Sequence, residues 1–257
     1  MNLYQAFIKI YGEELKRSHF VKINKKRPYF IRRVNEEIIH IITYAPAMSN
    51  VIGHNAPKAF CVLGGVATTY RKHLNFDLAP YKNNALLFSA GRFYCRCERF
   101  GFSATEYEKV NKFYYNEEHI LDDVYDSVVL VKKFMLPELD RADSLEDAVN
   151  FFRDYRIQDV AICIDRFLDD SPLFIEEIAA VLSFEKKIVE SYFTKRVNEI
   201  RQGAKDTIGI DALERVRDNT ILNCEKILND KTIQVRMINK SKTLKYHNLA
   251  LINKIIS

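Results

Sequence analysis

Three apolar segments between residues 20 and 70 constrain the fold of this chain more than any other feature. Aromatic and β-branched residues are frequent in each of them: residues 20–34, 38–44 and 60–66. A turn of three residues joins the first two segments, and a polar loop precedes the third. Short connections join antiparallel strands, so the pattern predicts a β-meander near the start of the chain.

Three further signals refine this sheet. Pro28 has no amide hydrogen to donate, so it is expected to open its strand or to lie at an edge. Gly64 and Gly65 interrupt the third segment, and glycines inside a strand mark a bulge or the close approach of another part of the chain. Residues 85–97 predict an additional hairpin, which gives four or five strands by about Phe102.

Helical patterns occupy the rest of the chain. Asn2 is suited to cap a helix that runs to about Arg17, ahead of the sheet. Ser144, followed three residues later by Asp147, resembles a capping box. The helices predicted after the sheet are 104–113, 117–134, 145–153, 157–168, 173–182, 184–202, 212–228 and one from about Val235.

These patterns together predict an α+β fold. It has an N-terminal helix, a four- to five-stranded, mainly antiparallel sheet and an all-helical C-terminal half. Residues 1–103 and 104–257 are the predicted domains, and one core shared by both halves is the alternative.

Cysteine usage and hydropathy predict a cytosolic protein. The five cysteines are odd in number and mostly scattered, which is typical of reduced thiols. The longest apolar runs are far shorter than the ~20 residues that span a bilayer, so no membrane association is expected. The first ten residues resemble the first turns of a folded helix and not a signal peptide.

The net charge is +5, and basic and acidic residues are concentrated in different segments of the chain. Residues 15–35 carry eight Lys or Arg and no acid, and residues 231–257 carry six and again no acid. Residues 105–190 carry 21 Asp or Glu against 10 Lys or Arg. Such asymmetry indicates either partners of opposite charge at different surfaces, or chain ends that fold against the middle.

One known family shares this arrangement of motifs. A helix leads into Tyr29-Phe-Ile-Arg-Arg33, and Phe60-Cys-Val-Leu-Gly-Gly-Val66 follows after an Ile-rich strand. Residues 5–200 resemble the bacterial domain-of-unknown-function 4304 family, in which a strand with an F-x-R motif precedes one of the type F-x-V-N-L-G. A helix containing Pro137 before the capped helix at Ser144 is similar to the helical half of that family.

The chain departs from this family at two motif positions. His19 stands where the family prefers Gly, and Leu63 follows Val62 where Asn is expected. The family has no settled activity, so the resemblance implies an α+β fold and no catalytic residue. Neighbouring families of similar size include immunity proteins that neutralise bacterial toxins, and this association suggests an antitoxin-like role.

The leading functional hypothesis is therefore protein binding without enzymatic activity. Carboxylates in the acidic middle would attract a basic partner protein, such as a nuclease toxin, and exposed tyrosines would anchor it. The residues assigned to this surface are Glu117, Glu118, Asp122, Asp123, Tyr107, Tyr114, Tyr115 and Tyr125.

Nucleic-acid binding is the alternative hypothesis. Residues 174–196 have the spacing of a helix-turn-helix, although the turn lacks Gly and ordinary helix packing produces the same spacing. The cations that would meet phosphates are Lys186, Lys187, Lys195, Arg196 and Arg201, together with the basic C-terminal segment. The basic strip of residues 16–33 could bind single-stranded nucleic acid, or it could be the solvent-exposed side of an edge strand.

An enzyme site in the sheet loops is the third hypothesis. His54, Asn55, Arg71 and His73 would form its pocket if the two loops converge, and otherwise they are solvated loop residues. Neither a metal nor a cofactor is expected. Cys95 and Cys97 have no second pair of ligands at a matching spacing, and the paired acids diverge on helix surfaces.

Overall fold

The computed structural model confirms the predicted α+β fold, with an N-terminal helix, an antiparallel sheet and a helical C-terminal half. It describes residues 1–23, 28–47, 58–70, 76, 87–90, 93, 111–144, 147–148, 151, 186–187, 190–191, 193–203 and 209–256.

The chain divides into two compact units. The first unit comprises residues 1–69, 73–152 and 247–257, and the second comprises residues 70–72 and 153–246. These limits differ from the sequence-based boundary at residue 103, because strand β6 (Phe113–Tyr115) and helix α4 (Ile120–Leu130) pack with the sheet and with the N-terminal helix.

Helix α1 (Leu3–Lys16) is capped by Asn2, as the sequence predicts, and the cap is a capping box. The Asn2 side chain accepts a hydrogen bond from the Gln5 amide at 2.9 Å, and the Gln5 side chain accepts one from the Asn2 amide at 3.1 Å. The buried side chains of α1 recur at helical spacing, and they are Leu3, Ala6, Phe7, Tyr11 and Leu15. The apolar stripe therefore faces the core.

Replacing Gly12, in the middle of α1, by Ala is expected to stabilise the protein. An added methyl group would lie 3.9 Å from the nearest Phe30 atom, which is an ordinary contact. Alanine in a helix interior is favoured over glycine by about 1 kcal/mol. Urea unfolding followed by circular dichroism should show a higher midpoint for Gly12→Ala, and an unchanged or lower midpoint would contradict this expectation.

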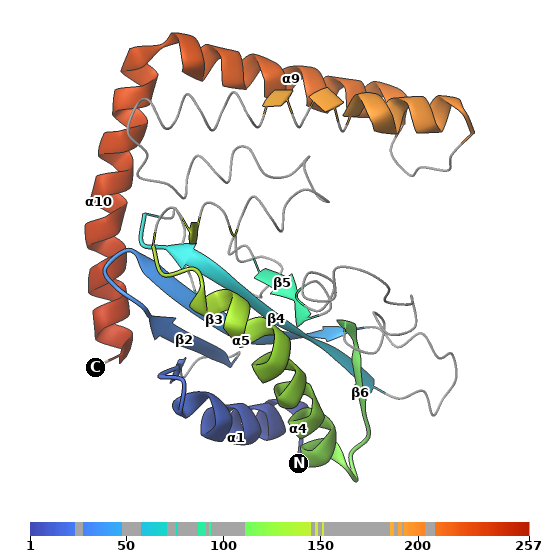
Figure 1. Cartoon of the computed structure of the whole chain (residues 1–257), viewed down its shortest axis with the longest axis vertical. Helices are drawn as coiled ribbons and strands as arrows, with labels where there is room; N and C mark the ends of the chain where they lie inside the picture. Colours follow the sequence, from blue (N-terminus) through green and yellow to red (C-terminus); the bar gives the residue numbers. More distant parts are fainter. Residues whose placement is uncertain are drawn as a thin grey trace. The chain divides into compact units, whose positions relative to one another are not determined.

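Five strands lie side by side in chain order and form an antiparallel sheet (Figure 1). They are β1 (Val21–Ile23), β2 (Tyr29–Arg33), β3 (Ile38–Ala47), β4 (Lys58–Thr68) and β5 (Leu87–Ser89). Pro28 directly precedes β2, as predicted, and its carbonyl accepts a hydrogen bond from Thr43 at 3.0 Å. Asn35 makes the tight β2–β3 turn by accepting hydrogen bonds from the amides of Glu37 and Ile38.

A sixth strand, β6 (Phe113–Tyr115), pairs with β4 at residues 58–60. The prediction of a helix ending at Phe113 is therefore wrong at this residue. The Phe60 ring contacts Phe113 and Tyr115, with ring centroids 5.5 and 5.9 Å apart, so a tertiary contact overrides the local pattern.

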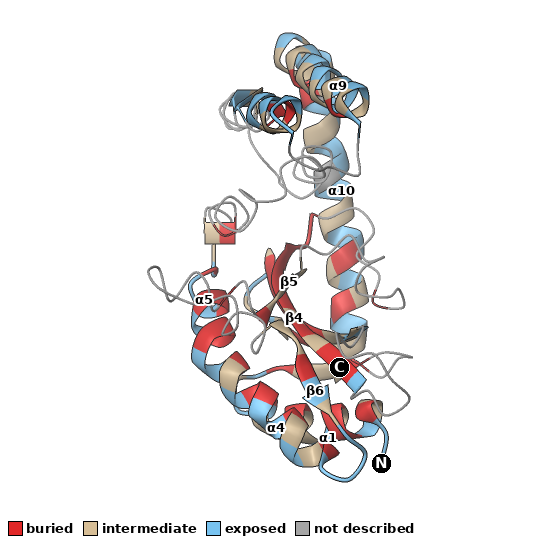
Figure 2. Cartoon of the chain, turned by 90° about the vertical axis from the view of Figure 1, so that its right-hand side faces the viewer, coloured by how far each residue is buried: buried red, intermediate tan, exposed pale blue. Residues whose placement is uncertain are grey.

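Helices cover one face of the sheet. In the first unit, Figure 2 shows α1 and helix α4 (Ile120–Leu130) on the opposite side of the sheet from the last turns of helix α10 (Lys231–Ile256). The Phe7 ring of α1 packs against three rings of this face, at 6.0 Å from Phe30, 4.7 Å from Tyr44 and 6.5 Å from Phe60. The Tyr11 hydroxyl, also on α1, lies 2.9 Å from the Ser127 hydroxyl of α4.

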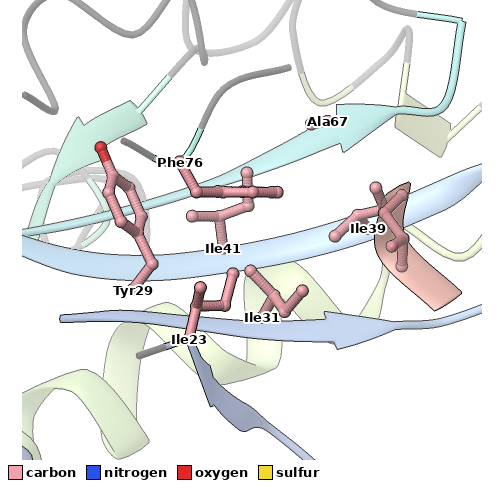
Figure 3. Close-up of a cluster of buried hydrophobic side chains, with 8 residues drawn as sticks. Ile23, Tyr29, Ile31, Ile39, Ile41, Ala67 and Phe76 are labelled. Carbon is pink, nitrogen blue, oxygen red and sulfur yellow. The ribbon is translucent and has the colours of Figure 1, made fainter. Parts of the chain in front are cut away.

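The opposite face of the sheet carries a separate apolar cluster (Figure 3). Ile252, near the end of α10, is fully buried in this cluster. The Asn248 side chain also donates a hydrogen bond to the Thr69 carbonyl at 2.8 Å, which ties the helix to the end of β4. The sheet residues of the cluster are Ile23, Tyr29, Ile31, Ile39, Ile41 and Ala67, with Phe76 beside them. Because both faces are covered, β3 is apolar almost throughout.

A single helical run of residues 120–140 contains a wide turn. It consists of α4, a π-helical segment η1 (Val131–Met135) and α5 (Leu136–Asp140). The Leu136 amide donates to the Val131 carbonyl, five residues back. Pro137 has no amide hydrogen and would clash with the carbonyl four residues earlier in a regular helix, so the wide turn accommodates it.

Described positions in the second unit are mainly helical, as predicted. Residues 186–201 are helical wherever the structure describes them, α9 spans Ile210–Asn229, and α10 begins at Lys231. Asp230 caps α10 by accepting hydrogen bonds from the amides of Thr232 and Ile233. The predicted helices at 157–168 and 173–182 lie outside the described residues.

The cap at Ser144 and the strand at 92–97 are two further predictions for the first unit. Asp147 donates its amide hydrogen to the Ser144 hydroxyl at 3.1 Å, which confirms the predicted cap. The prediction of a strand at 92–97 is wrong at Phe93, the one residue of this segment that the structure describes, because it is helical. Its ring is buried and lies 6.0 Å from the ring of Phe151, which is also helical.

Candidate functional site

The outward side of α4 combines negative charge with exposed apolar surface. Four exposed residues follow one another at intervals of three, one and three positions, and therefore form a single stripe: Asp122, Tyr125, Asp126 and Val129. Tyr125 and Val129 are 47% and 46% exposed. We call this stripe the α4 face.

Packing on the opposite side fixes the direction of the α4 face. Ile120, Val124, Ser127 and Val128 are buried. Ser127 donates to the Val124 carbonyl at 2.7 Å within α4 and meets the Tyr11 hydroxyl of α1, so rotation of α4 would break this buried contact between the two helices. The α4 face is thus held toward solvent by the core of the first unit.

The predicted acidic residues fall into two groups. Glu117 pairs with Lys58 at 2.6 Å, and this hydrogen bond lowers the pKa of Glu117 and raises the pKa of Lys58. Asp123 accepts a hydrogen bond from the Asn116 amide at 3.2 Å. Glu118 and Asp122 are exposed and have no partner among the residues that the structure describes.

Asp126 belongs to the α4 face although the sequence did not single it out. It is exposed and lies one helical turn after Asp122. The signal was present in the sequence, because residues four positions apart share a helix face. Free carboxylates therefore remain on this surface even though Lys58 neutralises one of the predicted acids.

The predicted tyrosines do not gather on the α4 face. Tyr125 lies on it, whereas Tyr115 is half-buried on β6 and packs its ring against Phe60. Tyr114 is 37% exposed, and alternation along the strand directs it away from Phe113 and Tyr115. Tyr107 lies outside the described residues. Of the predicted tyrosines that the structure describes, Tyr125 alone lies on the α4 face. Val129 is a second exposed apolar side chain there, which the sequence did not single out.

The cations of the predicted helix-turn-helix are mostly neutralised within the second unit. Lys186 pairs with Glu225 at 2.6 Å, Arg196 with Glu199 at 3.0 Å and Arg201 with Glu214 at 3.2 Å. Lys187 and Lys195 are exposed beside a shallow polar hollow of about 730 Å³, which Glu190 and Glu199 also line. Residues 174–185 lie outside the described part of the chain.

The predicted loop pocket falls outside the part of the chain that the structure describes. His54, Asn55, Arg71 and His73 all lie outside the described residues, as do Cys95 and Cys97. Where the chain is described, no group of three or more His, Cys, Asp or Glu side chains is arranged to hold a metal ion. Burial raises the pKa of the Cys61 thiol, which makes it a poor nucleophile.

A hydrogen-bonded network around the buried His40 joins the sheet to the end of α5. His40 on β3 lies opposite Arg32 on β2, and its Nδ1 accepts a hydrogen bond from the Arg32 guanidinium at 2.8 Å. Its Nε2 donates to the Ala142 carbonyl at 2.9 Å, and Arg32 also pairs with Asp140. Because Arg32 only donates and the carbonyl only accepts, this imidazole is neutral and protonated on Nε2.

Burial lowers the pKa of His40 from 6.5 to about 4, and the Arg32 charge acts in the same direction. The side chain is 1% exposed, so no substrate reaches it in this structure. Both ring nitrogens are used in hydrogen bonds. The network therefore acts as a tether between sheet and helix.

Comparison with known protein families, curated protein sequences and solved structures found no match for this chain. The resemblance to the domain-of-unknown-function 4304 family therefore stays a prediction. In the described residues, no helix is both long enough and apolar enough to cross a membrane.

Proposed function

We propose that this protein is a non-enzymatic binding protein whose α4 face docks a basic partner protein. The observation that carries the proposal is the pattern of the stripe itself. Two carboxylates, Asp122 and Asp126, alternate with two exposed apolar side chains, Tyr125 and Val129. A bacterial toxin with a cationic surface is the partner class that fits, and a cytosolic antitoxin-like role follows from that choice.

The chemistry of the stripe supports this choice of partner. Unpaired carboxylates accelerate encounter with a positively charged surface and disfavour acidic competitors. A large, partly exposed tyrosine supplies contact area with little loss of conformational entropy, and such residues are frequent binding hot spots. Rigid packing of α4 through Tyr11 and Ser127 means that little reorganisation is needed on binding.

The electrostatic part of this proposal is tested by Asp122→Asn with Asp126→Asn. A protein retained by the wild type from a lysate of the source cells is purified, and its association with both forms is followed by stopped flow. At low ionic strength the association rate constant is expected to fall about tenfold in the variant. Its dependence on salt should also flatten, because fewer charges are left to screen.

A matched control removes the same charge elsewhere in the first unit. Glu13 on α1 and Asp143 after α5 are exposed and do not belong to the α4 face. The Glu13→Gln, Asp143→Asn variant should associate like the wild type. Equal rate constants for the wild type and the Asp122, Asp126 variant, with the same salt dependence, would exclude the α4 face as the docking surface.

A further inference from the structure

The part of α10 in the second unit, residues 231–246, is rich in positive charge. Five Lys or Arg and no acid occur in this segment. Arg236, Lys240 and Lys242 are exposed and have no ion pair among the residues that the structure describes. This differs from Lys186, Arg196 and Arg201 of the same unit, each of which is paired with a glutamate.

An aromatic ring stands at the end of this basic segment. Tyr246 is 76% exposed, the most exposed large hydrophobic side chain in the described part of the chain. A tyrosine normally buries much of its ring, so this degree of exposure leaves ring surface accessible to a ligand.

The basic and aromatic groups share one side of the helix. Arg236, Asn239, Lys240 and Thr243 lie at intervals of three, one and three positions, and all four are exposed. Tyr246 follows Thr243 by three positions, which continues the same side. At 1.5 Å per residue, the distance along the helix from Arg236 to Tyr246 is about 15 Å, or about four nucleotide steps of a stacked strand. We call these five residues the α10 face.

We infer that the α10 face binds single-stranded nucleic acid, a site separate from the α4 face. Arg236 and Lys240 would contact successive phosphates, and Tyr246 would stack on an unpaired base. Asn239 and Thr243 add hydrogen-bonding groups for the sugar and phosphate oxygens.

The same observations weigh against two other polyanions. A helix that lies on an anionic membrane needs a broad exposed apolar side, and the α10 face offers a single tyrosine among polar groups. A duplex presents its phosphates but keeps its bases stacked, so the exposed Tyr246 ring would find no partner.

Binding is measured by fluorescence anisotropy with a labelled oligothymidylate of about 16 nucleotides, a length within the range of known single-strand sites. The intact chain is titrated at about 50 mM and about 200 mM salt, because phosphate contacts must weaken as salt rises. A duplex of equal length is titrated in parallel. Vesicles of phosphatidylcholine with and without phosphatidylserine are tested by co-sedimentation.

Two sets of variants separate phosphate contact from stacking. Arg236→Ala with Lys240→Ala should raise the Kd about tenfold and reduce the salt slope by about 1.4, at about 0.7 per phosphate contact. Tyr246→Ala should raise the Kd between about fivefold and about a hundredfold. Tyr246→Phe keeps the ring and should bind like the wild type.

The control variant is Lys9→Ala with Lys133→Ala, which removes two exposed charges from the first unit. It should leave binding unchanged. Three outcomes would overturn the inference: no binding at the lower salt concentration, a preference for the duplex or the anionic vesicles, or equal Kd values for Tyr246→Ala and the wild type. All substituted side chains are exposed, and circular dichroism verifies that each variant is folded.

Discussion

Acidification from neutral pH to about pH 4 is expected to lower the free energy of unfolding by roughly 3 kcal/mol through His40 alone. The pKa of His40 is about 4 in the folded protein, against an ordinary value of 6.5. Each tenfold change in proton affinity corresponds to about 1.4 kcal/mol. The folded state resists protonation because the ring is buried, and because a second proton on it would face the Arg32 guanidinium and break the hydrogen bond at Nδ1.

The direction of this effect follows from which state binds the proton. Between pH 6.5 and about 4 the unfolded chain takes up a proton at His40 and the folded protein does not. The contribution is fully present above pH 6.5 and is lost progressively as the pH falls toward about 4.

The contribution is isolated by comparing the wild type with His40→Gln. Glutamine retains one acceptor and a donor but does not titrate in this range. Urea unfolding at a series of pH values should show a steeper loss of stability for the wild type than for the variant. Parallel curves would mean that His40 titrates in the folded protein as it does in the unfolded chain.

Replacing Gly64 by Ala is expected to lower the free energy of unfolding by about 1–3 kcal/mol. Gly64 is buried in β4, and the side chain of Met135 lies directly against it. A methyl group built at Gly64 would overlap the Met135 sulfur and approach its Cγ to 3.0 Å. Met135 is fully buried, so its side chain has little room to move aside.

The cause of this loss is tested by a double-mutant cycle with Met135→Ala. Met135→Ala alone leaves a cavity and should cost about 2–5 kcal/mol. If the overlap is real, the double variant should be more stable than the sum of the two single effects by about 0.5–3 kcal/mol. Strict additivity would show that Gly64→Ala acts through the strand itself. Gly12→Ala, where an added methyl group has room, is the matched control and should move stability in the opposite direction.

Local patterns in the sequence were sufficient to predict the central strands of the sheet. β-Branched runs and the turn at Asn35 predicted β2 and β3, and Asn2 predicted the start of α1. Gly64 indicated a close approach but not which residue approaches, because Met135 lies 71 positions later. The short strand β6 was missed, since three residues carry too little periodicity and their pairing depends on Phe60.

The candidate site was predictable only in part, because ion pairs between distant residues are not encoded locally. The acidic helix surface was predicted, but the pairing of Glu117 with Lys58 required the fold. The Arg32–His40 pair was also missed, although these residues lie opposite each other across the β2–β3 turn. Helical spacing was enough to place Asp126 and Val129 beside Asp122 and Tyr125, once the buried side of α4 was known.

The position of Ile252 in the core has a consequence for biosynthesis. Arg33 on β2 hydrogen-bonds Asn253, 220 positions later, and Ile252 completes the apolar cluster on that face. At a translation rate of about 5–20 residues per second, the early strands wait on the order of ten to forty seconds for this helix. During that interval a nascent chain exposes the isoleucines of β2 and β3. We expect holdase chaperones at the ribosome to bind these strands.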